Sequence, residues 1–192
     1  MFALCVLAVF CSVTLSRSAP PACEGLVRPL DPLDRDHLAG RWVMVAGVLS
    51  DPAHLEHFKT RDSAVITFAN SSDSSKLSFT CAFNFGGNCR YLHCNISLVG
   101  SSFTLNDVNV TVTFLSTSCP DCLAMHFNNR ASKVQRLYLF SRRREVEPRV
   151  MEELQDQSRC LHLTPLVVMD PTKELCLKEM SGQRDTGTQT VS

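Results

Sequence analysis

The chain has 192 residues, 44% of them hydrophobic, and its 19 basic residues equal its 19 acidic residues. This balance predicts no basic surface for nucleic acid or for an anionic membrane. No Ser-His-Asp set, glycine-rich phosphate loop or pair of catalytic carboxylates stands out, so we expect neither an enzyme nor a cofactor.

The N-terminus predicts a secreted, extracellular protein. Residues 2–15 form an almost uninterrupted apolar run, which ends in the small residues of Ser16–Ala19. The run is too short to cross about 30 Å of hydrocarbon as a helix, so a signal peptide over residues 1–18 is favoured. The alternative is an N-terminal core helix, but two prolines follow the run directly. No other segment of the sequence is long and apolar enough to be a membrane span.

We assign residues 19–180 to one domain and the polar residues 181–192 to a disordered tail. Ten cysteines are present, and Cys5 and Cys11 belong to the signal peptide. The other eight predict a disulfide framework with about a hundred possible pairings. They are Cys23, Cys81, Cys89, Cys94, Cys119, Cys122, Cys160 and Cys176.

Three glycosylation sequons agree with secretion, at Asn70, Asn95 and Asn109. Each asparagine must point to water if it carries a glycan. We expect Asn95 and Asn109 on the polar faces of strands.

Alternating apolar residues predict β-strands in the middle of the chain. The apolar series are Leu77, Phe79, Cys81, Phe83, Phe85; Leu92, Cys94, Ile96, Leu98; and Val108, Val110, Val112, Phe114. Further strands are expected at 41–48, 64–69, 122–128 and 134–141, with turn residues between them. About eight short antiparallel strands predict a sandwich or an up-and-down barrel.

Helices are expected only at the edges of this region. Residues 34–38 form a short turn capped by Asp34, and residues 51–58 begin with an Asp-Pro cap. Residues 148–157 begin with proline and place apolar residues at helical spacing, so they predict the main α-helix.

Gly40-Arg41-Trp42, which opens the first strand, resembles the Gly-x-Trp signature of lipocalins, and Arg142 matches the late arginine that closes over the tryptophan. Residues 37–47, residues 114–120 and the order helix, Cys160, strand, Cys176 resemble the branch of apolipoprotein M and the α1-acid glycoproteins. Fish saxitoxin- and tetrodotoxin-binding proteins of this branch share the Pro-Ala-Cys-Glu start. The resemblance implies an all-β fold: an eight-stranded antiparallel up-and-down barrel with a short N-terminal helical turn and a C-terminal α-helix.

The resemblance also implies disulfide bonds Cys23–Cys160 and Cys89–Cys176. A four-residue hairpin loop over residues 86–89 would place Cys81 opposite Cys94 within bonding distance, so this pair is a hypothesis. Cys119 matches a cysteine whose partner lies in the helix of apolipoprotein M. The helix here has none, so Cys119–Cys122 is a second hypothesis, and a Cys81–Cys119 link would refute both.

Two other interpretations of the Cys119-Pro120-Asp121-Cys122 motif are a redox pair and a zinc site shared with Cys89 and Cys94. The flanks resemble strands rather than a βαβ unit, so a structural loop disulfide is favoured and we expect no metal. His54 and His57 could bind a metal weakly, but a solvated helix face is the more common arrangement.

The inward face of such a barrel would be apolar and wide enough for one small ligand, although a packed core would have the same composition. The expected ligand-binding residues are Phe79, Phe83, Arg90, Leu92, Ile96, Val110, Val112 and Phe114. In apolipoprotein M, residues just beyond the matching cysteine hold a lipid phosphate. Leu92 and Cys94 align with them here, which disfavours a phospholipid unless Arg90 substitutes.

The sequence leaves three candidate functions, each of a different class. The resemblance favours a monomeric carrier of a small hydrophobic ligand such as a lipid, drug or toxin, with lipoprotein particles as a further partner. A thiol-dependent lipid isomerase of the prostaglandin-synthase type is the second, if Cys81 or Cys94 is free. A ligand-free acute-phase or immunomodulatory glycoprotein that acts through its surface is the third.

Overall fold

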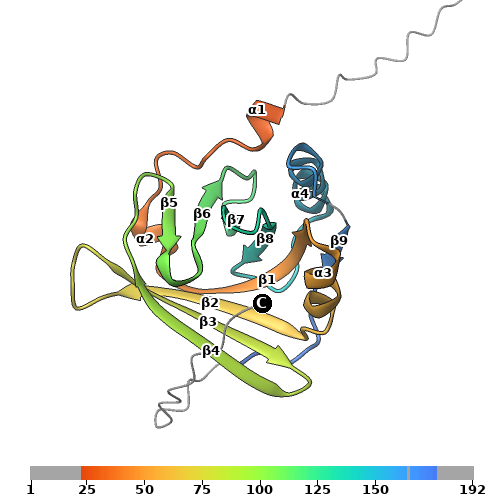
Figure 1. The fold of residues 1–192 in the computed structure, drawn as a ribbon, viewed down its shortest axis with the longest axis horizontal. Helices are drawn as coiled ribbons and strands as arrows, with labels where there is room; N and C mark the ends of the chain where they lie inside the picture. Colours follow the sequence, from red (N-terminus) through yellow and green to blue (C-terminus); the bar gives the residue numbers. More distant parts are fainter. Residues whose placement is uncertain (1–22, 164, 177–192) are drawn as a thin grey trace, which may run out of the picture.

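The fold is an antiparallel barrel with helices outside it (Figure 1). The computed structural model describes residues 23–163 and 165–176. The expected signal peptide and the tail from residue 181 therefore lie outside the described residues. The strands are β1 (Gly40–Leu49), β2 (Ser63–Asn70), β3 (Leu77–Phe85), β4 (Asn88–Ile96), β5 (Ser102–Leu105), β6 (Val110–Leu115), β7 (Cys122–Asn129), β8 (Gln135–Ser141) and β9 (Leu166–Val168).

The strands follow one another around the barrel in the order β4-β3-β2-β1-β8-β7-β6-β5, and every neighbouring pair is antiparallel. Pairing of β1 with β8 joins the two halves of the chain. β4 and β5 form the two ends of this sheet, and the chain turns between them at an isolated bridge of Val99 with Ser102. The barrel is therefore nearly closed, which confirms the eight-stranded up-and-down architecture; β9 adds a short strand beside β1.

Two parts of the chain differ from the prediction. β5 was not expected, because Gly100-Ser101-Ser102 is typical of a turn, yet Phe103 of this strand is buried. The strand expected to include Val108 begins only at Val110, after a 3₁₀ turn over Asn106–Val108. Val108 is consequently 40% exposed. Asn109 is exposed too, but it lies in a left-handed turn and not on the polar face of a strand.

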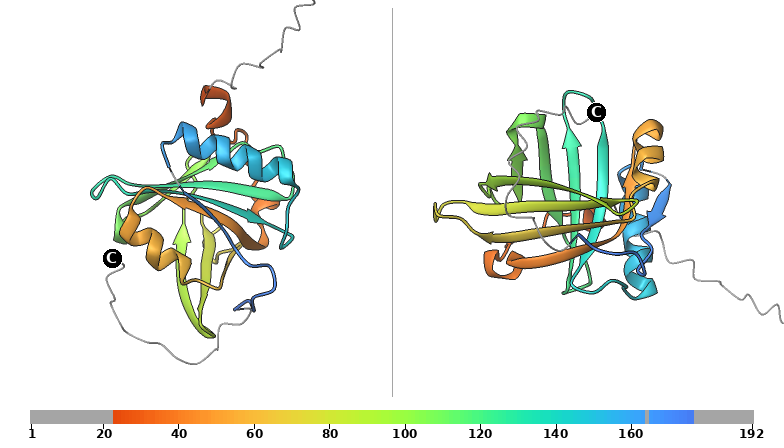
Figure 2. Two further views of the ribbon diagram at one scale, coloured as in Figure 1. Left: turned by 90° about the vertical axis from the view of Figure 1, so that its right-hand side faces the viewer. Right: turned by 90° about the horizontal axis from the view of Figure 1, so that it is seen from below.

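The helices begin where the caps were expected. The Asp34 carboxylate accepts a hydrogen bond at the start of α2 (Arg35–Leu38), and Asp51 does the same for α3 (Pro52–Lys59). The short α1 (Cys23–Leu26) precedes them. The main helix, α4 (Pro148–Cys160), lies outside the barrel (Figure 2) and packs Val150 and Leu154 into an apolar cluster with β7 and β8.

Aromatic side chains fill much of the barrel interior. Phe68 contacts Phe79 and Phe114, and Phe103 contacts the same two rings, with centroids 5.0–6.0 Å apart. All four rings are at most 3% exposed and belong to the same buried cluster as Trp42. This part of the interior is therefore a packed core.

Three disulfide bonds tie the ends of the chain and one loop to the barrel: Cys23–Cys160, Cys89–Cys176 and Cys119–Cys122. The first two are the pairs that the resemblance implied, and Cys119–Cys122 is the loop pair that the sequence left as a hypothesis. The first two close loops of 137 and 87 residues, which on a chain-entropy basis stabilises the fold by up to about 4–5 kcal/mol each.

The proposed Cys81–Cys94 bond is not formed, because the hairpin between β3 and β4 is shorter than expected. Phe85 pairs with Asn88, so the turn contains only Gly86 and Gly87. Both glycines have positive φ, 59° and 84°, as a two-residue type I′ turn requires. The resulting register places Leu92, not Cys94, opposite Cys81, and both thiols are free.

Candidate functional site

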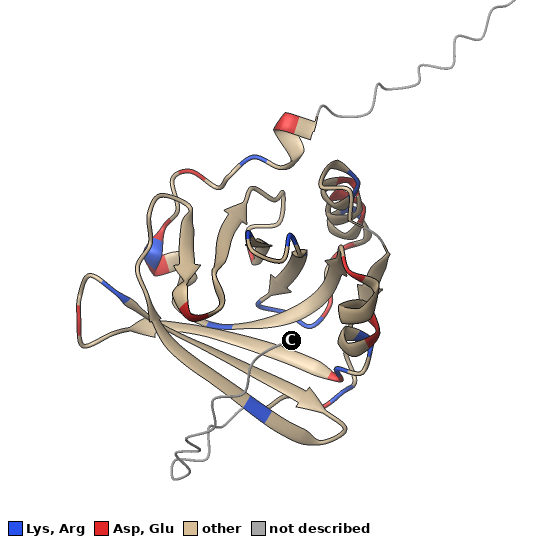
Figure 3. Cartoon of the chain, in the orientation of Figure 1, with Lys and Arg blue, Asp and Glu red and all other residues tan. Residues whose placement is uncertain are grey.

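The two ends of the barrel differ in their chemistry. We call the end covered by α2, with Trp42 and Arg142, the closed end. We call the opposite end, with α3, the Gly86-Gly87 turn and the loop between β7 and β8, the open end. The strands between them are mostly uncharged, whereas charged residues gather in helices and loops (Figure 3).

At the closed end Trp42 and Arg142 both have hydrogen-bond partners. The Trp42 indole is fully buried, and its Nε1 donates a hydrogen bond of 2.8 Å to the Leu38 carbonyl of α2. The Arg142 guanidinium lies 3.5 Å from the centre of the Trp42 rings. Its nitrogens donate to the backbone carbonyls of His37, Ala39 and Arg41 at 2.7–2.9 Å.

Gly40 permits this closure. Its φ is +96°, a left-handed conformation that favours glycine, and an added Cβ would lie 3.0 Å from Nη1 of Arg142. The Gly-x-Trp signature thus has a physical basis here: the glycine admits the arginine, and the arginine covers the tryptophan.

At the open end two arginines lie against aromatic rings. Arg61, in the loop after α3, places its guanidinium carbon 4.9 Å from the Phe58 ring, 4.4 Å from Phe83 and 5.6 Å from Phe85. Arg136 of β8 shares the inward face with Tyr138, because alternate residues of a strand point the same way. The charges of both arginines act on the Tyr138 phenol, so the three groups lie near one another.

The open end also contains buried donors without acceptors. Nε and Nη1 of Arg61 and Nε of Arg136 are shielded from solvent and have no hydrogen-bond partner among the described residues. The ion pairs between described residues do not involve either arginine. The two guanidinium groups therefore have no counter-charge within residues 23–163 and 165–176.

Burial shapes the ionisation of these groups. It lowers the pKa of the Arg61 guanidinium, an effect that Tyr138 opposes and the positive charge of Arg136 reinforces. Burial raises the pKa of the Tyr138 phenol, although the charges of Arg136 and Arg61 favour the phenolate. The site is thus a neutral phenol between two cations, since arginine is not deprotonated in proteins.

Gly47 of β1 makes room for this arrangement. A Cβ at this position would lie 2.5 Å from the Phe58 ring and 2.8 Å from the Tyr138 ring. The two rings stack with centroids 5.5 Å apart and planes 10° apart. Tyr138 is consequently held between α3 and β1.

The residues expected to bind ligand are divided between the two regions. Phe79, Ile96, Val110, Val112 and Phe114 belong to the buried core. Phe83 lies half-buried under Arg61 at the open end.

The two other expected ligand-binding residues, Leu92 and Arg90, face the same side as Cys81 and Phe83, opposite which they pair. However, Leu92 is 52% exposed. Arg90 is also exposed, with its guanidinium carbon 5.7 Å from the Phe85 ring. Arg90 lies near the open end of β4, whereas Leu92 is at the middle of this edge strand, so neither belongs to an enclosed wall.

Sequence reasoning missed the two central arginines. Arg136 carried a signal, since it alternates with Tyr138 and Phe140 within an expected strand, and a charge on an apolar face is unusual. Arg61 carried none, because it belongs to a loop that only the tertiary structure places over the phenylalanines.

The two free thiols lie beside this site. Cys81 is buried, and desolvation raises the pKa of its thiol well above its usual range, with a further contribution from Cys94 and an opposing one from Arg61. Cys94 is only partly buried, and desolvation raises its pKa as well. Thiolates, the nucleophilic form, are therefore disfavoured at both positions.

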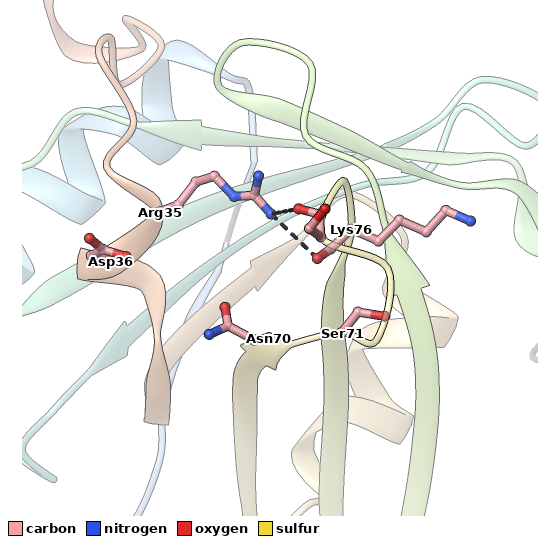
Figure 4. Close-up of a pocket in the computed structure, with 6 residues that line it drawn as sticks. Arg35, Asp36, Asn70, Ser71 and Lys76 are labelled. Carbon is pink, nitrogen blue, oxygen red and sulfur yellow. Dashed lines mark hydrogen bonds between the residues drawn. The ribbon is translucent and has the colours of Figure 1, made fainter.

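A groove of about 470 Å³ lies outside the barrel near the closed end, between α2 and the loop from β2 to β3 (Figure 4). The Arg35 guanidinium, which lines this groove, already donates to the Ser74 and Lys76 carbonyls at 3.4 and 3.3 Å. Asn70 lines the groove and is exposed, as are the sequon residues Asn95 and Asn109. The groove is polar and internally bonded, so the open end remains the candidate site.

Neither a metal cluster nor a membrane-spanning helix occurs among the described residues. Over residues 23–163 and 165–176, no three His, Cys, Asp or Glu side chains come together as a metal site would require. Within the same ranges, no helix combines the length and apolar character needed to cross a membrane.

A barrel of this topology, with a tryptophan covered by an arginine at one end, defines a lipocalin. The family model of the ApoM domain matches residues 31–180, so the chain belongs to the ApoM domain family. No curated protein matches the sequence.

Solved structures of siderocalins share the fold. Ex-FABP, described as functioning through dual ligand specificities, is 18% identical, with a TM-score of 0.61 over 69% of this chain and 93% of that one. A second siderocalin, described as having a dual ligand binding mode, is 17% identical, with a TM-score of 0.63 over 73% of this chain and 94% of its own.

Proposed function

We propose that this lipocalin is a secreted, non-enzymatic carrier that binds one small apolar or amphipathic ligand at the open end of its barrel. The observation that carries the proposal is the apolar surface left uncovered along the edge strand β4, which begins at this end. Leu92, on the inward side of the edge strand β4, is 52% exposed beside the half-buried Phe83. Exposed apolar surface inside a concave fold is typical of a ligand site. Membership of the ApoM domain family and the dual ligands of the siderocalins agree with it.

The two free thiols give little support to the alternative function, a thiol-dependent lipid isomerase. A nucleophilic cysteine needs a lowered pKa, whereas burial raises the pKa of both Cys81 and Cys94. The thiols instead serve as reporters of the site, since Cys94 lies on the inward face of β4 next to Leu92.

Two readouts on the secreted protein test the carrier function. Dodecanoate should displace a fluorescent fatty acid, and saturating dodecanoate should slow alkylation of Cys94 by iodoacetamide, with peptide mapping to identify the labelled residue. Native mass spectrometry of protein from its natural fluid should detect a co-purifying small molecule. An empty protein that neither binds the fluorescent probe nor protects Cys94 would contradict the proposal and favour the glycoprotein that acts through its surface.

A further inference from the structure

We infer that an N-linked glycan on Asn70 is held in the groove between α2 and the loop from β2 to β3, whereas glycans on Asn95 and Asn109 extend into solvent. The first sugars on Asn70 are then a fixed part of the closed end of the barrel. The inference uses the secretion in the proposed function but not the ligand, so it stands separately from the carrier.

The position of Asn70 suits the attachment of a glycan. It is the last residue of β2, its side chain is exposed, and Ser72 supplies the hydroxyl that the sequon requires. In the secretory pathway the amide nitrogen attacks C1 of the first sugar of a lipid-linked oligosaccharide. The bond from C1 to the lipid diphosphate breaks, the nitrogen–carbon bond forms, and one amide proton is lost. The sugars nearest to the protein are then two N-acetylglucosamine units.

The groove has the size of these first sugars. Its volume is about 470 Å³, and clefts of roughly 300–1,000 Å³ hold compounds of drug size. A disaccharide is a compound of that size. Figure 4 shows the Asn70 side chain pointing from the end of β2 toward α2. A glycan on this residue therefore starts inside the groove.

The lining of the groove offers the donors and acceptors that a sugar requires. The hydrogen bonds that the Arg35 guanidinium makes to the Ser74 and Lys76 carbonyls both come from Nη2. Within residues 23–163 and 165–176, neither Nε and Nη1 of Arg35 nor the carboxylate of Asp36 has a hydrogen-bond partner. A guanidinium only donates and a carboxylate only accepts, whereas a sugar hydroxyl does both. The first sugars can therefore bind Arg35 and Asp36 together.

The other two sequon residues lie away from this groove. Asn95 is exposed on the outer face of the edge strand β4, since Leu92 and Cys94 face inward. Asn109 is exposed in a turn with a φ of 51°. Neither residue lines the groove. A glycan on Asn70 would contact α2, the helix that helps to cover the closed end, whereas the other two glycans would begin on an open strand face and an open turn.

Site-resolved deglycosylation of the folded, secreted protein tests the inference. Peptide N-glycosidase converts each asparagine that it releases to aspartate, so mass spectrometry gives a rate for every sequon. We expect release from Asn70 to be about tenfold or more slower than from Asn95 and Asn109, because hydrogen bonds in the groove keep that glycan closed for most of the time. After denaturation and alkylation the difference should disappear.

Two matched variants locate the contact. Arg35→Gln/Asp36→Asn removes the charged lining of the groove, so it should accelerate release from Asn70 in the folded protein by about fivefold or more. Glu56→Gln/Lys59→Gln removes an exposed acid and an exposed base from α3 at the open end and should leave this rate unchanged. Circular dichroism checks that both variants are folded.

Thermal unfolding gives a second readout. Asn70→Gln loses the glycan and should lower Tm by about 2–4 °C, the shift that corresponds to the net contribution of one hydrogen bond. Asn95→Gln should leave Tm unchanged. Equal losses of Tm, equal release rates in the folded protein, or slow release that Arg35→Gln/Asp36→Asn does not change would overturn the inference.

The outcomes also separate the inference from the proposed function. A secreted protein that has glycans on the other two sequons but none on Asn70 would overturn the inference and leave the carrier intact. Absence of glycans from all three sequons would contradict both the inference and the secretion on which it depends.

Discussion

The arginines at the two ends of the barrel contrast in burial and in bonding. Arg142, at the closed end, is exposed, yet its guanidinium lies on Trp42 and donates to three backbone carbonyls. Arg61 and Arg136, at the open end, bury nitrogens that have no acceptor among the described residues. An arginine that stabilises the fold should have its donors satisfied, whereas one that awaits a ligand should not. The contrast separates a structural end from a binding end.

The largest expected effect concerns aromatic residues at the two ends. Trp42→Ala removes a fully buried side chain, so it should lower the free energy of unfolding by about 3–5 kcal/mol. Phe83→Ala, at the half-buried rim, should lower it by about 1–2 kcal/mol. Urea denaturation of both variants measures the difference. Equal losses would show that the open end stabilises the fold as much as the closed end does.

The arginines give the second comparison. Arg142→Gln loses three hydrogen bonds and the contact with Trp42, and should destabilise the protein by about 2 kcal/mol. Arg61→Gln loses contacts with phenylalanine rings but also removes a buried cation without a partner, so stability should change by less than about 1 kcal/mol. Thermal unfolding compares them. A loss for Arg61→Gln as large as that for Arg142→Gln would make Arg61 a structural residue.

Titration of Tyr138 should give a smaller effect at the open end. The chain has two tyrosines, so Tyr91→Phe leaves Tyr138 as the only phenol in an ultraviolet pH titration. Its pKa should lie above the ordinary 10.0, because burial outweighs the two arginine charges. Above pH 10 the unfolded chain loses a proton that the native phenol keeps, so stability should fall as the pH rises. The double variant Arg61→Gln/Arg136→Gln should raise the pKa further, and a lower pKa would contradict the arrangement.

The alternation of apolar residues was sufficient to predict most of the barrel, because a strand with one buried face has a period of two. Boundaries were less predictable where turn residues occur inside a strand or apolar residues inside a turn, as at Ser102 and Val108. The register of β3 and β4 depended on whether the hairpin loop has two residues or four. That difference moved Cys94 two positions along the strand and removed the expected bond to Cys81.

The candidate site was predicted only in part. The closed end follows from a local motif and one distant arginine, so Gly40, Trp42 and Arg142 could be chosen from the sequence. The open end depends on where loops fold. Nothing local indicates that Arg61 lies over the ring of Phe83 or reaches Tyr138 of β8. Which apolar positions are packed and which are exposed, as at Leu92, also depends on how the edge strands separate.

Hydrogen exchange measured by mass spectrometry, with and without saturating dodecanoate, tests the division between the two ends most directly. The account predicts slower exchange in peptides that contain Arg61, the β3–β4 hairpin and Arg136. It predicts no change in α2 or around Trp42, where the hydrogen bonds are already complete. Protection confined to α2 and Trp42, with unchanged exchange around Arg61 and Arg136, would contradict the assignment of the open end as the ligand-binding end.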